Sequence, residues 1–276
     1  MISALSFTSF ALAVLLYTSA AGVFFVEIAR SPGGKATEPP RLAPVLLGAG
    51  ALAHGTYVIV ASFVAHLCPV RSLHFFLSMG SLVATLVFLG ARRHFRVHAL
   101  GVVVAPVGLV ATLGTFFIGN IEPQTSMPGS FISMHVFANL AGLALFLLAC
   151  GAAVMYLIQE RRLKRRAPLR KGLPALDSLD RAEHRFLLAG FPLLTLGIAS
   201  GTVWASKLES GSPDELLRTI FGYATWLLIA GVLLLRVVSG WRGRRAAYGT
   251  VAGFAFAALV LAIYLARPFI HGGQGG

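Results

Sequence analysis

Eight long apolar runs constrain this chain more than any other feature of its sequence. The chain has 276 residues, of which 57% are hydrophobic and only 12% are charged, whereas soluble domains carry about 25% charged residues. A membrane-spanning helix needs roughly 20 mostly apolar residues. Runs of that length lie at approximately 3–29, 42–65, 73–91, 98–119, 131–158, 184–206, 216–236 and 246–267. We therefore predict an all-α fold, with residues 1–276 forming a single integral membrane domain, a polytopic bundle of eight transmembrane helices.

The distribution of basic residues predicts how the bundle lies in the membrane. Of the 23 Lys and Arg residues, 19 lie in the segments that follow the first, third, fifth and seventh runs or at the edges of the runs that border them. Basic segments stay on the cytoplasmic side, so both termini are expected on the outer, extracytoplasmic side of a bacterial inner membrane. The net charge of +13 then reflects orientation and indicates no nucleic-acid partner. The most basic segment, the cytoplasmic loop 159–183, is expected to face anionic lipid. Residues 1–26 carry no charged side chain, so the first run is expected to be a retained helix, not a cleaved signal.

One histidine lies deep in the second run. His54 is near the middle of that run, and an ionisable residue at such a depth is a candidate functional residue. Its neighbours Gly50, Ala51 and Gly55 are small, which leaves room for a flat ligand or for a closely packed helix. The alternative is that Ala51 and Gly55 form a packing seam and that His54 bonds a neighbouring carbonyl group.

Two further histidines lie at the expected outer face. His135 is near the start of the fifth run, in "SFISMHVFANLAGLALFLL", and Asn139 follows it by one helical turn, where its amide can orient the imidazole. His271 follows the eighth run on the same side. If these helices are neighbours, both imidazoles could bind one haem iron from opposite faces. The alternatives are interfacial snorkelling for His135 and an accidental polar residue in the tail for His271.

Other patterns for site chemistry are weak. Cys68 and Cys150 are far apart and form no CxxC motif, which argues against a thiol–disulfide relay or a zinc site. His66 and His74 flank a short turn, but two imidazoles alone rarely hold a metal ion. The sequence contains no Walker A loop and no GxSxG motif, so we assign no catalytic residue and leave open whether the protein is an enzyme.

Three ordered blocks in the second half of the chain resemble a known family. They are "SMHVFANLAGLALFLLACGAAVMYLIQERRLKRR", "LPALDSLDRAEHRFLLAGFPLLTLGIASGTVWA" and "GWRGRRAAYGTVAGFAFAALVLAIYLARPFIH". Together, over 131–271, they resemble the cytochrome c assembly family, which includes CcsA, ResC and the smaller HemX-like and YpjD-like proteins. The resemblance implies binding of haem, transiently as haem b, and its delivery at the outer face for attachment to apocytochrome c. It also implies His135 and His271 as axial ligands, and His54 as the second-span histidine of the small relatives.

The sequence departs from the larger members of that family in two places. The segment "ASKLESGSPDELLR" contains no tryptophan where those members have a tryptophan-rich loop, and Leu234 stands where they have a histidine. The chain therefore resembles the small HemX-like branch. The implied partners are haem, apocytochrome c and other cytochrome c maturation membrane proteins, with this chain as a non-catalytic subunit of a haem lyase system.

Two other functions are alternatives. The first is a membrane regulator or scaffold of haem biosynthesis that transfers no haem. The second is a small-solute transporter in which His54 is the proton or substrate site. A transporter is expected to contain paired broken helices, and Pro106 and Pro192 are the residues that could break two of the spans.

Overall fold

The computed structural model describes most of the chain as α-helix. It describes the backbone of residues 2–30, 41–64, 73–95, 97–118, 129–166, 173–205 and 213–271. Side chains are described for residues 4–29, 41–62, 74–93, 95, 97–117, 134–166, 173–203 and 219–259. These residues form α-helices and one 3-10 turn, with no strand among them, which confirms the predicted all-α fold class.

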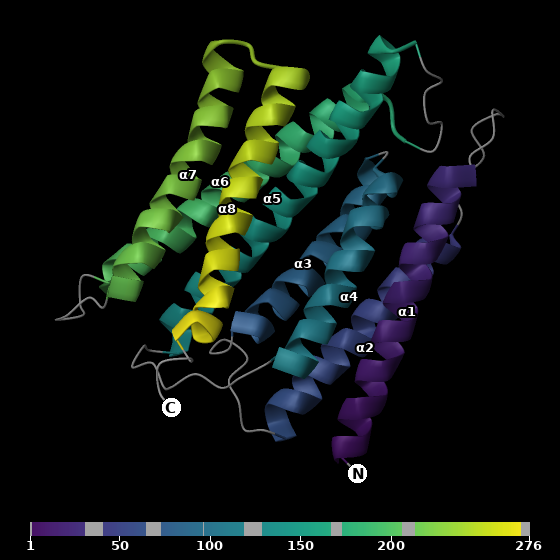
Figure 1. Cartoon of the computed structure of the whole chain (residues 1–276), viewed down its shortest axis with the longest axis vertical. Helices are drawn as coiled ribbons and strands as arrows, with labels where there is room; N and C mark the ends of the chain where they lie inside the picture. The colour runs from purple at the N-terminus through teal and green to yellow at the C-terminus, as the bar shows by residue number, and fades with distance from the viewer. Residues whose placement is uncertain are drawn as a thin grey trace.

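The helices alternate in direction along the bundle. In chain order they are α1 (Ile2–Arg30), α2 (Leu42–Val64), α3 (Leu73–His94), the 3-10 turn η2 (His98–Leu100), α4 (Gly101–Ile118), α5 (Gly129–Lys164), α6 (Leu176–Ala205), α7 (Pro213–Val238) and α8 (Arg244–His271). Figure 1 shows that the beginning of α1 and the end of α8 lie at the same end of the bundle. The opposite end carries the basic segments, and we call it the basic end.

Seven of these helices are long and apolar enough to cross a membrane. The candidate spans are Ala4–Ala29, Leu42–Ser62, His74–Arg93, His98–Phe117, Met134–Lys164, Leu176–Val203 and Thr219–Val238. They agree with the first seven predicted runs, and the chain is a multi-pass membrane protein. The eighth span, 246–267, falls on α8, whose side chains are described only to residue 259, so it stays a prediction.

Two helices extend well beyond the spans that hydropathy predicts. The apolar run predicted over 131–158 continues as α5 to Lys164. α6 begins at Leu176, before the run predicted from 184 and at the stretch "DSLD", whose Asp177 and Asp180 predict a helix start. Ion pairs one turn apart link Lys164 to Glu160 on α5 and Arg181 to Asp177 on α6. Such pairs support helix in water, so these ends remain helical after the apolar pattern stops.

Neither internal proline breaks its helix. α4 continues through Pro106 and α6 continues through Pro192. Membrane helices tolerate proline because neighbouring helices can satisfy the backbone groups that it leaves without partners. The paired broken helices expected of a transporter are therefore not found at these two positions.

The bundle is built from two four-helix halves that share one core. Packing is most extensive between α1 and α2 and between α5 and α6, and the two halves meet mainly where α3 lies against α5. The shared core includes Tyr17, Phe24 and Phe88 from the first half and Phe146 and Leu148 from the second. Many large apolar side chains point outward, as expected for a surface that faces lipid.

Candidate functional site

His135 lies near the beginning of α5 and faces α6. It is half-buried, and its Nδ1 is 2.9 Å from the Ser200 hydroxyl oxygen. Gly201 follows on α6, and a Cβ there would lie only 3.2 Å from the Cε1 atom of His135. The absence of a side chain at Gly201 therefore lets the imidazole lie against the α6 backbone.

The contacts of Ser200 indicate which nitrogen of His135 carries the proton. The Ser200 hydroxyl donates to the carbonyl oxygens of Leu196 at 2.7 Å and Gly197 at 2.9 Å. A hydroxyl has one hydrogen, so its oxygen is left to accept from the N–H at Nδ1 of His135. We infer the tautomer from this network. It leaves the lone pair at Nε2, the form in which a neutral imidazole binds a metal.

Asn139 lies beside His135, as the sequence predicts. Its Nδ2 is 3.3 Å from Nε2 of His135 and also donates to the His135 backbone carbonyl at 2.9 Å. A Cβ at Gly197 would collide with the Asn139 amide. Because α6 has no side chain at that position, the amide fits between the helices and lies against the imidazole.

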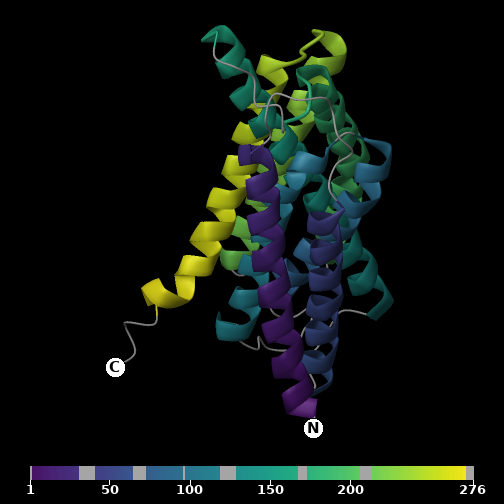
Figure 2. The same cartoon turned by 90° about the vertical axis from the view of Figure 1, so that its right-hand side faces the viewer.

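The pairing of His271 with His135 is not tested by the described residues. His271 is the last residue of α8 and its side chain lies outside the described residues. The described contacts of α5 with the N-terminal part of α8 lie toward the basic end, between Phe146 and Phe254 and around Ala153 and Ala247. Figure 2 shows the C-terminal part of α8 turning away from the other helices. Coordination of one iron by both histidines stays a prediction.

His54 is completely buried among side chains of the first half. Its Nδ1 is 3.3 Å from the Tyr17 hydroxyl of α1, and its Nε2 is 2.5 Å from the Ser78 hydroxyl of α3. The rings of Tyr17 and His54 meet edge to face at 5.8 Å. All three side chains are 0% exposed. In this arrangement neither imidazole nitrogen is free for a ligand, and His54 joins three helices.

The remaining candidates form no metal site among the described residues. His66 and Cys68 lie outside those residues, and His74 is half-buried near the start of α3. No group of three or more His, Cys, Asp and Glu side chains that could hold a metal ion is found in the described part of the chain. Cys150 is a buried free thiol.

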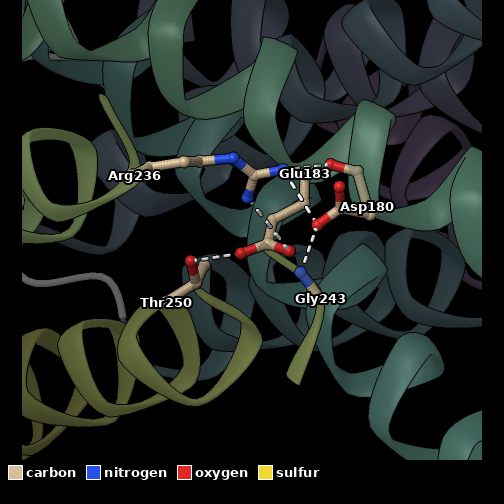
Figure 3. Close-up of polar contacts among 5 residues, drawn as sticks. All are labelled: Asp180, Glu183, Arg236, Gly243 and Thr250. Carbon is tan, nitrogen blue, oxygen red and sulfur yellow. Dashed lines mark hydrogen bonds and ion pairs between the residues drawn. The ribbon is translucent and has the colours of Figure 1, made fainter. Parts of the chain in front are cut away.

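A buried charged cluster lies at the basic end, where the sequence indicated only a helix start. Figure 3 shows its members: Asp180 and Glu183 from α6, Arg236 from α7, Thr250 from α8 and the preceding Gly243. The Arg236 guanidinium lies 2.9 Å from Asp180 Oδ1 and 3.8 Å from Glu183 Oε2. Thr250 donates to Glu183 at 2.6 Å. Glu183 is 0% exposed and Arg236 is 8% exposed, so the cluster joins three helices inside the protein.

The block "GWRGRRAA" forms the turn that completes this cluster. Gly243 has a φ of +61°, which favours glycine, and a Cβ there would lie 2.5 Å from the Tyr156 hydroxyl oxygen. Its N–H donates to Asp180 Oδ1 at 2.8 Å. Asp180 therefore satisfies one of the N–H groups that the start of α8 leaves without a helical partner.

Leu234 and Arg236 point in opposite directions from α7. Two residues are separated by about 200° around an α-helix, and Leu234 is 62% exposed while Arg236 is buried. Leu234, where the resemblance implies a histidine in the larger family members, therefore faces outward from the bundle. Trp226, earlier on α7, packs inward: it stacks on Phe191 and donates to Thr195 at 2.9 Å.

Comparisons with known proteins agree with the resemblance found in the sequence. The family described as "Cytochrome C assembly protein" matches residues 67–271. Three similar proteins carry the name "Cytochrome c biogenesis protein CcsA". The one from Gloeothece citriformis is 25% identical over 241 residues, 67% of this chain and 73% of that protein. The one from Chlamydomonas reinhardtii is 27% identical over 166 residues, 56% of this chain and 45% of that protein.

The third similar protein matches a shorter segment of the chain at higher identity. The protein from Picosynechococcus sp. is 38% identical over 82 residues, which are 30% of this chain and 24% of that protein. The alignments with the second and third of these proteins span less than half of their lengths. No solved structure matches the chain. Because the family match covers more than half of the sequence, the chain belongs to the cytochrome c assembly protein family.

Proposed function

We propose that this protein handles haem during cytochrome c biogenesis. It binds haem at the end of the bundle where α5 begins and presents it for attachment to apocytochrome c. The observation that carries the proposal is the 2.9 Å contact between Nδ1 of His135 and the Ser200 hydroxyl, from which we infer the tautomer with its lone pair at Nε2. The family membership and the names of the similar proteins support the process.

The chain's own residues position the ligand and supply no acid–base chemistry in this proposal. Ser200 fixes the imidazole of His135. The Asn139 amide lies 3.3 Å from Nε2 and moves away from that nitrogen when a ligand binds. Haem supplies two things. Its iron binds the imidazole, and its vinyl groups are the sites to which the thiols of the substrate add. His271 is the proposed second ligand, and it reaches the same iron only if the outer part of α8 approaches α5.

The proposed orientation follows the positive charge. The ends of α3, α5 and α7 and the beginnings of α6 and α8 carry most of the basic residues, and we place that end in the cytoplasm. With α8 as an eighth span, His135 and both termini lie on the outer side of a bacterial inner membrane. Apocytochrome c and the other maturation proteins would meet the chain there.

Purified protein from haem-replete cells is expected to show the absorbance of haem b, with a reduced spectrum after dithionite. The His135→Ala variant is expected to lose most of that absorbance per mole of protein, because the variant removes the nitrogen that binds iron. Absorbance spectra of detergent-purified wild type and variant provide the measurement. His74→Ala is the matched control, since His74 is also half-buried and lies at the same end of the bundle.

Two results would contradict haem handling. One is wild-type protein that never carries haem, even after incubation with hemin. The other is a His135→Ala variant whose spectrum and haem content equal those of wild type and of His74→Ala. Either result would favour a membrane regulator or scaffold of haem biosynthesis. The outward direction of Leu234 is the observation that favours this alternative.

Removing the Ser200 hydroxyl is expected to weaken haem binding without removing the ligand. Partners that orient a metal-binding histidine typically contribute 10–100-fold to affinity, so Ser200→Ala should raise the apparent Kd for hemin by about tenfold. Ser200→Thr keeps a hydroxyl and should restore most of the affinity. Hemin titration followed at the Soret band measures both variants. Thr202→Val, which removes an exposed hydroxyl of α6, should leave the Kd unchanged; equal losses for Ser200→Ala and Thr202→Val would contradict the positioning role.

A further inference from the structure

Two arginines meet one tyrosine at the basic end, where α5 ends and α8 begins. Arg161 Nη2 donates to the Tyr248 hydroxyl at 3.4 Å, and the Arg244 guanidinium carbon lies 5.4 Å from the centre of the Tyr248 ring. All three side chains are exposed. Ala247 packs against Leu157, one turn before Arg161, and this contact fixes the register that brings the three side chains together.

The positive charge at this place is only partly neutralised. Lys164 lies 2.6 Å from Glu160 Oε1, and the Nε of Arg244 lies 3.8 Å from Glu160 Oε2. In the contacts of the described residues, the three cations Arg161, Lys164 and Arg244 thus share one carboxylate. Like charges that lie close together repel one another, so an additional anion among these side chains would be bound favourably.

The surroundings favour an anion that belongs to a lipid. The candidate span on α5 ends at Lys164, so Arg161 lies at the boundary between the apolar span and water, where aromatic side chains such as Tyr248 are enriched. Ile158 and Val154 lie one and two turns deeper on the same side of α5 as Arg161, and they are 43% and 38% exposed. A headgroup on the cations would therefore place its acyl chains along these apolar side chains.

We propose that Arg161, Arg244 and Tyr248 form a binding site for the phosphate of an anionic phospholipid. Guanidinium groups bind phosphate through two parallel hydrogen bonds. The Tyr248 hydroxyl accepts from Arg161, which leaves its own hydrogen to donate to a phosphate oxygen. Basic pockets between transmembrane helices on the cytoplasmic side bind anionic headgroups. The site combines Arg161 of the segment 159–183 with two residues of α8, and it does not depend on haem binding.

Titration of the full-length protein with phosphatidylglycerol tests the site. The protein is purified in a neutral detergent, and bound lipid is counted by native mass spectrometry. Each Arg near an anionic surface contributes about a factor of five to affinity, so Arg161→Gln combined with Arg244→Gln should raise the Kd at least tenfold. Tyr248→Phe should raise it about threefold. Arg165→Gln combined with Arg166→Gln removes two exposed cations outside the site and should leave the Kd within twofold of wild type.

Parallel titrations with phosphatidylcholine and with inorganic phosphate separate the sources of the anion. Phosphatidylcholine should bind at least tenfold more weakly than phosphatidylglycerol, and inorganic phosphate should not displace the lipid. Equal losses for the two double variants would overturn the proposal, because they would indicate attraction by overall charge. Displacement by millimolar inorganic phosphate would overturn it in favour of a soluble anion. If the double variant of Arg161 and Arg244 does not fold, the Tyr248→Phe variant is sufficient as a test, because an unchanged Kd for that variant overturns the proposal.

Discussion

Replacing Arg236 with leucine is expected to destabilise the protein by about 3–5 kcal/mol, because the change leaves buried carboxylates without their cation. Glu183 would keep only the hydrogen bond from Thr250, and Asp180 only that from the Gly243 N–H. Neutral hydrogen bonds between membrane helices contribute about 0.6 kcal/mol on average, so the cost of the unpaired charge dominates. Reversible unfolding of detergent-solubilised protein in sodium dodecyl sulfate, followed by tryptophan fluorescence, measures the difference.

The same measurement on companion variants distinguishes the effect of a buried charge on stability from the effect of an ion pair on the helix surface. Glu183→Leu together with Arg236→Leu should cost less than the sum of the two single changes, since replacing a buried ion pair by apolar residues removes the unpaired charge. Asp177→Asn is the control, because its partner Arg181 and Asp177 are 58% and 72% exposed and such pairs contribute about 0–1 kcal/mol. An Arg236→Leu variant as stable as Asp177→Asn would contradict the role assigned to the cluster.

The His54→Ala variant is expected to lose about 2–5 kcal/mol of stability and no haem. The change leaves a cavity in the first half and removes one hydrogen-bond partner from each of the Tyr17 and Ser78 hydroxyls, which are buried. Unfolding in sodium dodecyl sulfate gives the stability, and the Soret absorbance per mole of folded protein gives the haem content. Since His54 is 0% exposed and is enclosed by side chains of α1 and α3, we expect the haem content to equal that of wild type.

Two companion variants test whether His54 is a helix-joining residue or a haem ligand. Ser78→Ala should destabilise the protein in the same direction, by about 1–3 kcal/mol, because it leaves Nε2 of His54 without a partner. Thr56→Ala, an exposed hydroxyl on the same helix, should change the stability by less than about 0.5 kcal/mol. A His54→Ala variant with wild-type stability and no haem would instead identify His54 as a ligand.

Features set by local sequence were predicted well. The apolar runs gave the all-α fold and the first seven spans because a span is defined by length and hydropathy alone. The contact between His135 and Asn139 follows from helical spacing, since residues four apart lie on one face. The extension of α5 to Lys164 was missed because charged side chains can continue a helix by pairing with one another, whereas the acidic residues at Asp177 and Asp180 predicted where α6 starts.

Features that depend on packing between distant helices could not be predicted. Ser200 lies 65 residues after His135, and only the register of α6 against α5 brings the hydroxyl to the imidazole. The small residues of "IASG" indicated a place where another helix could pack closely, but they did not indicate which residue would lie there. Likewise, Glu183 and Arg236 come from separate runs, and hydropathy treats each as an isolated polar residue. The direction of the outer part of α8 depends on tertiary packing, so the distance between His135 and His271 was beyond sequence reasoning.

The division of the bundle into two four-helix halves has a consequence for how the protein is made. The chain leaves the ribosome from its N-terminus, and N-terminal units generally fold first. α1, α2 and α3 are joined by the Tyr17, His54 and Ser78 hydrogen bonds without any residue of the second half. The first half therefore has the contacts it needs to assemble while α5 is still being synthesised, and α3 then offers a finished surface on which α5 docks.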